Sequence, residues 1–310
     1  MSRLARHPFV WASAAVILLL SSTTAHAEYS GNQATTQGYA NASLLESAQE
    51  VADHLRDPQV RILDARSPDR YAAGHILGAV NLPVAEITRT IDGVPGMLPP
   101  IKEVERALGR RGITRDTRVV VYDDFGGDRA TRLFWILDSL GHPRVSVLQG
   151  GFALWQQEGR PTSREISNPK TTRYQGDPRP NRAADRNWIR NRLKDPLIVL
   201  VDARSPAEFD GKVPGPDVRR PGHIPGAVNV DWVRNLTTTE PRRFKTAADL
   251  AQLYRRAGAT SDKEIVLYCR TGMRASHDYF VLRLLGYPRV RLYDGSYVDW
   301  AATATSPVAK

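Results

Sequence analysis

Residues 63–68, LDARSP, return as residues 201–206, VDARSP, and this repetition decides the fold. Two more pairs follow in the same order. GHILGAVN at 74–81 matches GHIPGAVN at 222–229, and LGHPRV at 140–145 matches LGYPRV at 285–290. A repeat of this length indicates two copies of one structural unit. The offset between the copies rises from 138 to 148 residues, so the second copy carries a ten-residue insertion within 211–221.

Each copy alternates short β-branched runs with amphipathic stretches, a pattern typical of strands followed by helices. In the first copy we expect strands at 60–63, 119–122 and 145–148 and helices at 101–111 and 129–140. In the second copy we expect strands at 197–201, 265–268 and 290–293, with helices at 247–256 and 274–285, the first capped by Thr246. The order predicts an α/β protein of two homologous domains, each a parallel sheet flanked by helices on both faces.

The N-terminus has the pattern of a secretory signal peptide. Arg3 and Arg6 precede an apolar run at 9–20, and residues 25–27 read AHA. A membrane anchor is the alternative, but the run is about a dozen residues long where a span needs about 20. We therefore expect cleavage after Ala27, a periplasmic or secreted protein, and no stable membrane anchor. Residues 28–43 form a polar leader, 44–158 the first domain, 159–183 a Pro-rich extended linker and 184–310 the second domain.

Composition narrows the range of partners. The chain has 43 Lys and Arg against 33 Asp and Glu, a net charge of +10, with no basic block and no nucleic-acid motif. Diffuse positive charge suits the attraction of small anions rather than a nucleic acid. The seven histidines show no metal-ligand spacing and no nucleotide fingerprint is present, so we expect neither a metal nor a cofactor.

Cys269, the only cysteine, begins the stretch CRTGMR at 269–274, between an expected strand and an expected helix. Parallel sheets bind ligands at the carboxyl ends of their strands, where this residue falls. The helix N-terminus and the guanidinium groups of Arg270 and Arg274 would favour the thiolate, the nucleophilic form. A lone cysteine is otherwise a small buried apolar residue. Its context favours catalysis, and an unpaired thiol in an exported protein fits that view.

The first copy has no such nucleophile. Aligning the strands at Tyr122 and Tyr268 sets Asp123 opposite Cys269, and the loop DDFGGD at 123–128 is acidic. We expect Asp123, Asp124 and Asp128 to be solvated carboxylates at a helix start. The sequence therefore predicts one catalytic and one inactive domain.

The paired DAR-SP and GHI-x-GA-x-N motifs, the loop CRTGMRAS and the ending YDGSYVDW at 293–300 together resemble the tandem-domain rhodanese sulfurtransferases, over about residues 44–302. The resemblance implies that Cys269 attacks thiosulfate or 3-mercaptopyruvate and becomes a persulfide, which cyanide or a thiol then accepts. The substrate loop would comprise Arg270, Thr271, Gly272, Met273 and Arg274, with backbone N–H groups holding the anionic sulfur.

The donor is less clear from the resemblance. Arg270 resembles the basic loop of thiosulfate-using members, while Thr271 resembles the serine of mercaptopyruvate-using members. Glu208 stands where family members place a substrate-binding arginine, and Arg219 and Arg220 in the insertion are candidates to replace that charge. We favour thiosulfate, because flanking guanidinium groups suit a dianion.

Asp64 and His75 match an aspartate and a histidine that approach the loop hydroxyl in mercaptopyruvate-using members. A proton relay through Thr271 is one reading. Both copies keep the pair, as Asp202 and His223 in the second, so support of the loops is the reading we favour.

Two rival functions remain. Cysteine phosphatases of related fold place arginine six positions after the nucleophile, where this chain has Ala275. A non-catalytic sulfur carrier or binding module is the second alternative, because fold does not fix function.

Overall fold

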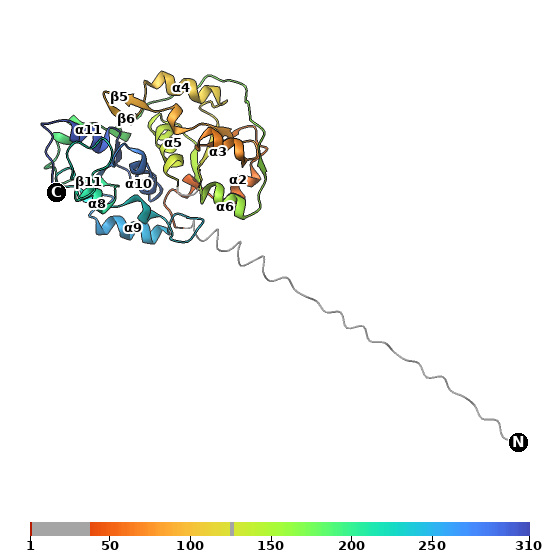
Figure 1. The fold of residues 1–310 in the computed structure, drawn as a ribbon. Coiled ribbons are helices and arrows are strands. Elements are labelled where there is room, and N and C mark those ends of the chain that lie inside the picture. Colours follow the sequence, from red (N-terminus) through yellow and green to blue (C-terminus); the bar gives the residue numbers. More distant parts are fainter. Residues whose placement is uncertain (2–37, 125–126) are drawn as a thin grey trace.

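The computed structural model describes residue 1 and residues 38–124 and 127–310. It contains two similar α/β units side by side (Figure 1). Each is built on a five-stranded sheet in which every neighbouring pair of strands is parallel. The expected fold of two parallel-sheet domains is confirmed.

The first domain has the strand order β1-β8-β7-β2-β4. Its strands are β1 Leu45–Glu46, β2 Val60–Asp64, β3 His75–Ile76, β4 Val80–Asn81, β5 Arg89–Ile91, β6 Val94–Met97, β7 Arg118–Tyr122, β8 Val145–Leu148 and β9 Thr162–Ser163. Its helices are η1 Ala42–Leu44, α2 Ala48–Asp53, α3 Pro68–Ala73, η2 Val84–Glu86, α4 Ile101–Arg110, α5 Asp128–Ser139 and α6 Gly151–Gln157. Strands β5 and β6 form a separate antiparallel hairpin.

The second domain repeats this plan with the order β10-β14-β13-β11-β12. Its strands are β10 Ala183–Ala184, β11 Ile198–Asp202, β12 Val228–Asn229, β13 Glu264–Tyr268 and β14 Val290–Tyr293. Its helices are η3 Pro180–Arg182, α7 Arg186–Arg190, α8 Pro206–Phe209, η4 Trp232–Asn235, α9 Ala247–Arg256, α10 Met273–Leu284 and α11 Ser296–Ala302. All strands and helices expected from the sequence are present, with ends that differ by one residue or less.

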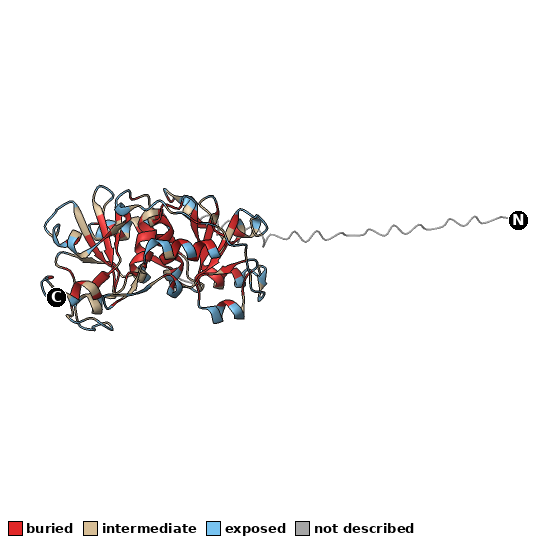
Figure 2. Ribbon diagram, turned by 90° about the horizontal axis from the view of Figure 1, so that it is seen from above, coloured by how far each residue is buried: buried red, intermediate tan, exposed pale blue. Residues whose placement is uncertain are grey.

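The two domains share one hydrophobic core. Helices α5 and α10 lie against each other at the centre, and both are buried along most of their length (Figure 2). Phe134 of α5 packs edge-on against Phe280 of α10, with ring centroids 4.9 Å apart. A separate apolar cluster fills the far face of each sheet, around Trp155 in the first domain and Trp300 in the second. Burial of this kind on both faces is what a parallel sheet requires.

The segments outside the sheets lie over the domains. In the linker, Thr172 donates to the carbonyl of Gly109 (2.9 Å) and Asp177 to that of Leu140 (2.7 Å), so this stretch runs extended along the first domain. In the leader, the amide of Asn41 donates to the carbonyl of Leu284 (3.0 Å). Residues 38–41 thus form an arm on the second domain.

The expected signal peptide lies outside the described residues, apart from residue 1. Among the described residues, no helix has the length and apolar character needed to cross a bilayer.

Candidate functional site

Cys269 follows β13 directly and lies at the carboxyl edge of the second sheet. The residue is 1% exposed. Its amide donates to Oγ of Ser296 (3.2 Å), and its carbonyl accepts the amide of Tyr297 (3.0 Å). The backbone of Cys269 is therefore held by hydrogen bonds to the first residues of α11.

Ser296 is held in a left-handed conformation, with φ of 51°, where a side chain costs about 1–3 kcal/mol. Its hydroxyl donates to the carbonyl of Tyr293 (2.8 Å) while accepting the amide of Cys269. The matching residue of the first domain is Gly151, with φ of 57°. Serine thus replaces glycine only where the loop carries the thiol. Sequence reasoning missed this residue, although it lies in the 293–300 motif.

The loop ends at Gly272, the N-cap of α10, which has φ of 83°. A Cβ at this position would lie 2.9 Å from Nη1 of Arg132 and 3.1 Å from the carbonyl oxygen of Asp294. Both the backbone conformation and the space require glycine here. Met273 is the first residue of the helix and packs against the shared core. Thr271 lies beside Gly96 of the β5–β6 hairpin, so the first domain forms a wall of the site.

The corresponding loop of the first domain, which has no cysteine, shows what such a turn binds. Oδ1 of Asp123 accepts the amide of Gly127 (3.0 Å), and Oδ2 accepts those of Arg129 (3.0 Å) and Ala130 (3.2 Å). The carbonyl of Asp123 accepts an amide from the start of α6, as that of Cys269 does from α11. Three backbone N–H groups at a helix start therefore hold an anionic group that belongs to the chain.

The two loops can be matched residue by residue at their ends. Gly127 and Gly272 are both left-handed N-caps with φ of 83°, so the counterparts of the three amides belong to Gly272, Arg274 and Ala275. Among the described residues, no acceptor is recorded for these three N–H groups. They provide a site for an anion next to Cys269.

The expectation that Asp123 is solvated was wrong. The residue is 2% exposed, because its carboxylate lies inside the ring of amides. Burial and the charge of Asp128 raise the pKa of Asp123 to about 6, against the lowering effect of the three amides. Asp124 pairs instead with Arg70 (3.1 Å), and Asp128 is half-buried.

The two guanidinium groups of the loop differ in their partners. Nη1 and Nη2 of Arg274 contact the carboxylate of Glu208 at 2.7 and 2.8 Å. Burial alone would raise the pKa of Glu208, but Arg274 and the hydrogen bonds from Ser205 lower it to about 2. Arg270 extends to the surface, with Nη1 3.4 Å from the carbonyl of Pro216 and 3.6 Å from Asp217. The two side chains are similarly exposed, 29% for Arg270 and 24% for Arg274, so they differ mainly in how closely a carboxylate pairs with them.

Of the two arginines that the insertion was expected to contribute to the substrate site, Arg220 binds elsewhere. The guanidinium of Arg220 donates to the carbonyls of Trp300, Ala301, Thr303 and Ser306, which satisfies the end of α11. Its assignment to the substrate site is corrected to a structural role, because these four carbonyls engage all its nitrogens. Arg219 is exposed on the insertion, which itself lies against the side chains of Arg270 and Glu208.

The possible relay residues are bound within their own surroundings. Asp64 pairs with Arg66 (2.6 Å) and accepts the hydroxyl of Tyr122 (2.5 Å). The ring nitrogens of His75 contact the carbonyls of Tyr71 (2.8 Å) and Glu165 (3.0 Å).

Asp202 pairs with Arg204 (2.6 Å), as Asp64 pairs with Arg66 in the first domain. The recorded hydrogen bonds of Asp64, His75 and Asp202 to described residues do not reach Thr271. The structure therefore favours support of the loops over a relay.

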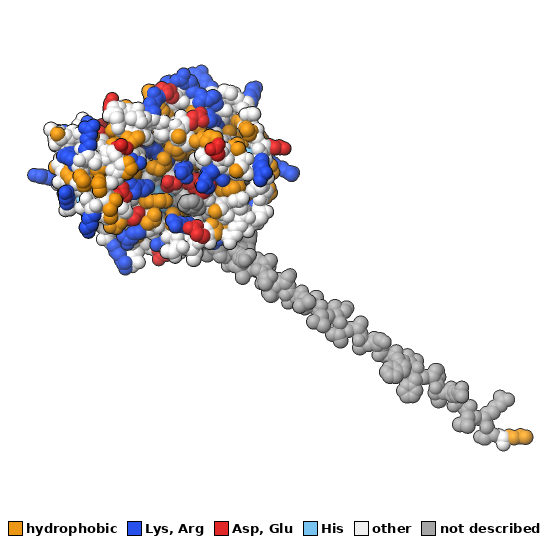
Figure 3. Space-filling view, in the orientation of Figure 1, with side chains coloured by type: hydrophobic (Ala, Val, Ile, Leu, Met, Phe, Trp, Pro, Cys, Tyr) orange, Lys and Arg blue, Asp and Glu red, His pale blue; other side chains and the backbone are white. Residues whose placement is uncertain are grey.

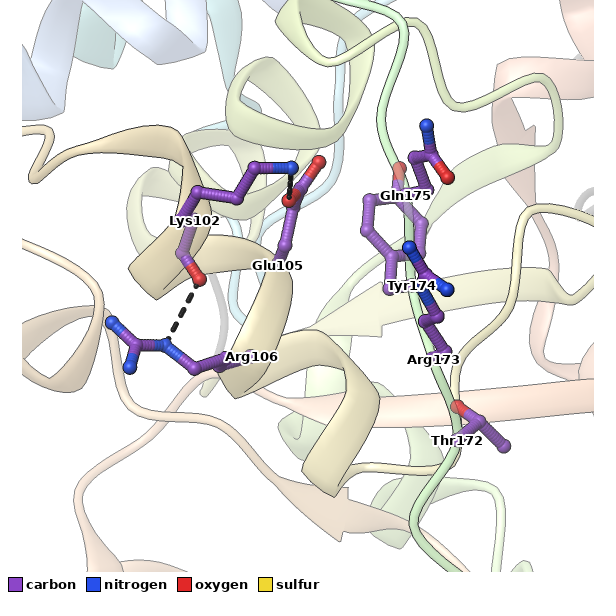
Figure 4. A pocket seen from close by; sticks show the side chains of 7 residues that line it. All are labelled: Lys102, Glu105, Arg106, Thr172, Arg173, Tyr174 and Gln175. Carbon is purple, nitrogen blue, oxygen red and sulfur yellow. Dashed lines mark hydrogen bonds and ion pairs between the residues drawn. The ribbon is translucent and has the colours of Figure 1, made fainter.

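A cavity of about 600 Å³ lies elsewhere, between α4 and the linker (Figure 4). Its lining residues are Lys102, Glu105, Arg106, Thr172, Arg173, Tyr174 and Gln175. No residue of the 269–274 loop lines it, so this cavity is separate from the candidate site at Cys269. On the face shown in Figure 3, basic side chains are spread over both domains and interspersed with acidic ones. Among the described residues, no cluster of His, Cys, Asp and Glu could hold a metal ion.

Known proteins resemble this chain over both of its domains. The model of the rhodanese-like domain matches residues 47–158 and 185–303. The sulfur carrier protein TtuD of Thermus thermophilus is 36% identical over 292 residues, 88% of this chain and 99% of that protein. A thiosulfate sulfurtransferase of Azotobacter vinelandii is 35% identical over 87% of this chain and 98% of its own length.

Solved structures give the same picture. SseA from Escherichia coli, described as a 3-mercaptopyruvate sulfotransferase, aligns with a TM-score of 0.74 and 29% identity over 82% of this chain and 98% of its own. EanB in complex with ergothioneine aligns with a TM-score of 0.78 and 25% identity, over 87% of this chain and 70% of its own.

Proposed function

Because this chain belongs to the rhodanese-like family and is a sulfurtransferase, we propose that it takes the outer sulfur of thiosulfate onto Cys269 and passes it to cyanide or a thiol. The observation that carries this proposal is the carboxylate of Asp123 held by three amides in the inactive loop. The matching amides of Gly272, Arg274 and Ala275 would hold the negative terminal sulfur of a persulfide in the same way.

The reaction has two steps that balance without a cofactor. The thiolate of Cys269 attacks the outer sulfur of thiosulfate, a new S–S bond forms, and sulfite leaves with the electron pair of the broken bond. An acceptor then attacks the terminal sulfur, and the thiolate of Cys269 leaves with the electrons of the persulfide bond. With cyanide the product is thiocyanate. In support, a related EanB structure with 25% identity and a TM-score of 0.80 is described as containing a cysteine persulfide.

The choice of thiosulfate rests on charge and on the relatives. Arg270 is partly exposed and lacks a close bidentate carboxylate partner such as Glu208 provides for Arg274, so its charge is available to a dianion. Relatives named thiosulfate sulfurtransferases are 33–35% identical over 87% of the chain. The alternative donor is 3-mercaptopyruvate, which the hydroxyl of Thr271 and the likeness to SseA support.

The export of the protein is a separate proposal, which rests on the sequence of residues 1–27. Mass spectrometry of the protein recovered from its native host tests it. A mature chain that begins at Glu28 supports cleavage, and an intact residue 1 contradicts it.

The mass of the protein after exposure to thiosulfate tests the reaction. We expect a gain of one sulfur atom on Cys269, its loss when cyanide is added with formation of thiocyanate, and neither event in Cys269→Ser. Turnover with 3-mercaptopyruvate and none with thiosulfate would show that 3-mercaptopyruvate is the donor. Bound sulfur without turnover for any acceptor would indicate a carrier, and release of phosphate from an aryl phosphate would indicate a phosphatase.

A further inference from the structure

An arginine of the inactive domain reaches the catalytic loop. Arg132 is in the second turn of α5 and is fully buried between the domains. Its Nη2 donates to the carbonyl of Gly96 in the β5–β6 hairpin (2.8 Å) and forms an ion pair with the carboxylate of Asp294. Its Nη1 is buried and has no hydrogen-bond partner among the described residues. This nitrogen lies against Gly272, where a Cβ would be only 2.9 Å away.

The partners of Arg132 all border the loop. Oδ2 of Asp294 accepts the amide of Leu98 (2.9 Å), which follows the hairpin. The hairpin in turn contacts the loop, because a Cβ at Gly96 would lie 3.2 Å from the carbonyl oxygen of Thr271. Arg132 therefore connects the hairpin of one domain to Gly272, which ends the turn that carries Cys269, and to Asp294, which borders it.

The inactive side of the interface shows that packing alone does not require this ion pair. The counterpart of Arg132 is His277 on α10, whose Cδ2 would lie 3.8 Å from a Cβ at Gly127. The counterpart of Asp294 is Gln149, whose side-chain oxygen accepts the amide of Phe244 (2.9 Å). An amide side chain thus makes the contact to the neighbouring domain where there is no cysteine. The buried guanidinium and its carboxylate occur only on the side with the thiol.

A buried N–H group without a partner costs about 1–3 kcal/mol, so its retention needs a reason. We propose that Arg132 is a positioning residue for the sulfur transfer at Cys269, which holds the catalytic loop against the hairpin and directs positive charge toward its anion-binding amides. This inference rests on the proposed function, and it gives the inactive domain a part in the reaction. The residue acts through the loop and does not itself touch the donor.

Alkylation of Cys269 tests this role without any sulfur donor. Iodoacetate and iodoacetamide differ in charge but not in the atom attacked, so the ratio of their rates reports the electrostatic potential at the thiol. We expect Arg132→Met to lower the iodoacetate to iodoacetamide ratio about fivefold, as removal of a nearby positive charge predicts. We also expect kcat with thiosulfate to fall about tenfold.

The matched control is Tyr279→Phe. It removes a different buried contact between the same two helices, the hydrogen bond from Tyr279 to Asp138 (2.5 Å). This variant should lose thermal stability and keep the wild-type alkylation ratio. A folded Arg132→Met protein with the wild-type ratio would overturn the proposal, even if kcat fell.

Arg132→Lys covers the case in which Arg132→Met does not fold. Lysine keeps the charge but cannot reach Gly96, Asp294 and the loop together. We therefore expect a retained ratio with kcat about fivefold lower, and a wild-type kcat would contradict the positioning role. Because alkylation needs only the thiol, the ratio decides the role of Arg132 even if thiosulfate proves not to be a substrate.

Discussion

Glu208 holds Arg274 with both carboxylate oxygens, at 2.7 and 2.8 Å from the two terminal nitrogens. Arg274 belongs to the 269–274 loop, so an anionic donor that binds there meets an arginine whose charge Glu208 already balances. Glu208→Gln keeps the shape and removes the negative charge. We expect the KM for thiosulfate to fall about fivefold, since one charge near the site is worth about 1 kcal/mol to an anion. Steady-state kinetics with both donors measures this, and an unchanged KM would place the donor away from Arg274.

Gly272→Ala should abolish sulfur transfer. The added Cβ meets Arg132 and the carbonyl of Asp294 in a left-handed backbone, and we expect a loss of stability of about 2–4 kcal/mol. Gly226→Ala is the matched control, because Gly226 has φ of 80° and nothing within 4 Å of its added Cβ. It should cost about 1 kcal/mol and leave activity intact. Equal losses in urea unfolding would show that backbone strain, and not the close contact, explains the glycine.

Two substitutions at Ser296 separate strain from hydrogen bonding. Ser296→Ala keeps the left-handed strain and leaves the buried amide of Cys269 without its acceptor, so both thermal stability and kcat should fall, with a stability loss of about 1–3 kcal/mol. Ser296→Gly also loses the acceptor but relieves the strain, as Gly151 does in the inactive domain. It should be close to wild type in melting temperature and still have a lower kcat. Wild-type kcat in both variants would show that this hydrogen bond does not affect the thiol.

Arg270 belongs to the 269–274 loop, whereas the guanidinium of Arg220 binds carbonyls at and after the end of α11, so only Arg270 is expected to bind the donor. Arg220→Met should lower the melting temperature, because four carbonyls at and after the end of α11 lose their hydrogen bonds to this guanidinium, and should leave the KM for thiosulfate unchanged. Arg270→Ala should raise that KM with little effect on melting. The reverse pattern in kinetics and calorimetry would return Arg220 to the substrate site.

The raised pKa of Asp123 predicts that the stability of the protein depends on pH. Burial and Asp128 raise its pKa to about 6, above the value of about 3.9 in an unfolded chain. A raised carboxyl pKa contributes stability that is complete below about pH 4 and is lost as the pH rises through 6. The stability of the wild type relative to Asp123→Asn should therefore fall by about 2 kcal/mol between pH 4 and pH 7. Urea unfolding of both proteins at the two pH values measures it, and a constant difference would mean that Asp123 ionises as in water.

The sequence was sufficient for the fold because its evidence is local and repeated. Short apolar, β-branched runs marked β13 and β14, Thr246 marked the start of α9, and the second copy supported the elements of the first. The same reasoning located Cys269, since a polar loop between a buried strand and the following helix lies at the carboxyl edge of a parallel sheet.

The contacts of the site depend on distant partners, which no local pattern carries. Glu208 and Arg274 are 66 residues apart, and Arg132 and Asp294 are 162 apart and in different domains. The partners of the Arg220 guanidinium could not be predicted from the sequence either, because they are backbone carbonyls, which every residue has. Asp123 was misjudged as solvated since carboxylates at helix starts are commonly exposed, and only the closed ring of amides shows otherwise.

The tethered carboxylate of Asp123 gives this protein an internal reference. The amides of Gly127, Arg129 and Ala130 are occupied permanently by a group that cannot dissociate, whereas those of Gly272, Arg274 and Ala275 would be filled only while sulfur is in transit. Hydrogen exchange at the first three thus calibrates full occupancy, and exchange at the second three can be read against it within one molecule. The half of the chain with aspartate at this position would thus serve as a built-in standard for the loading state of the half with cysteine.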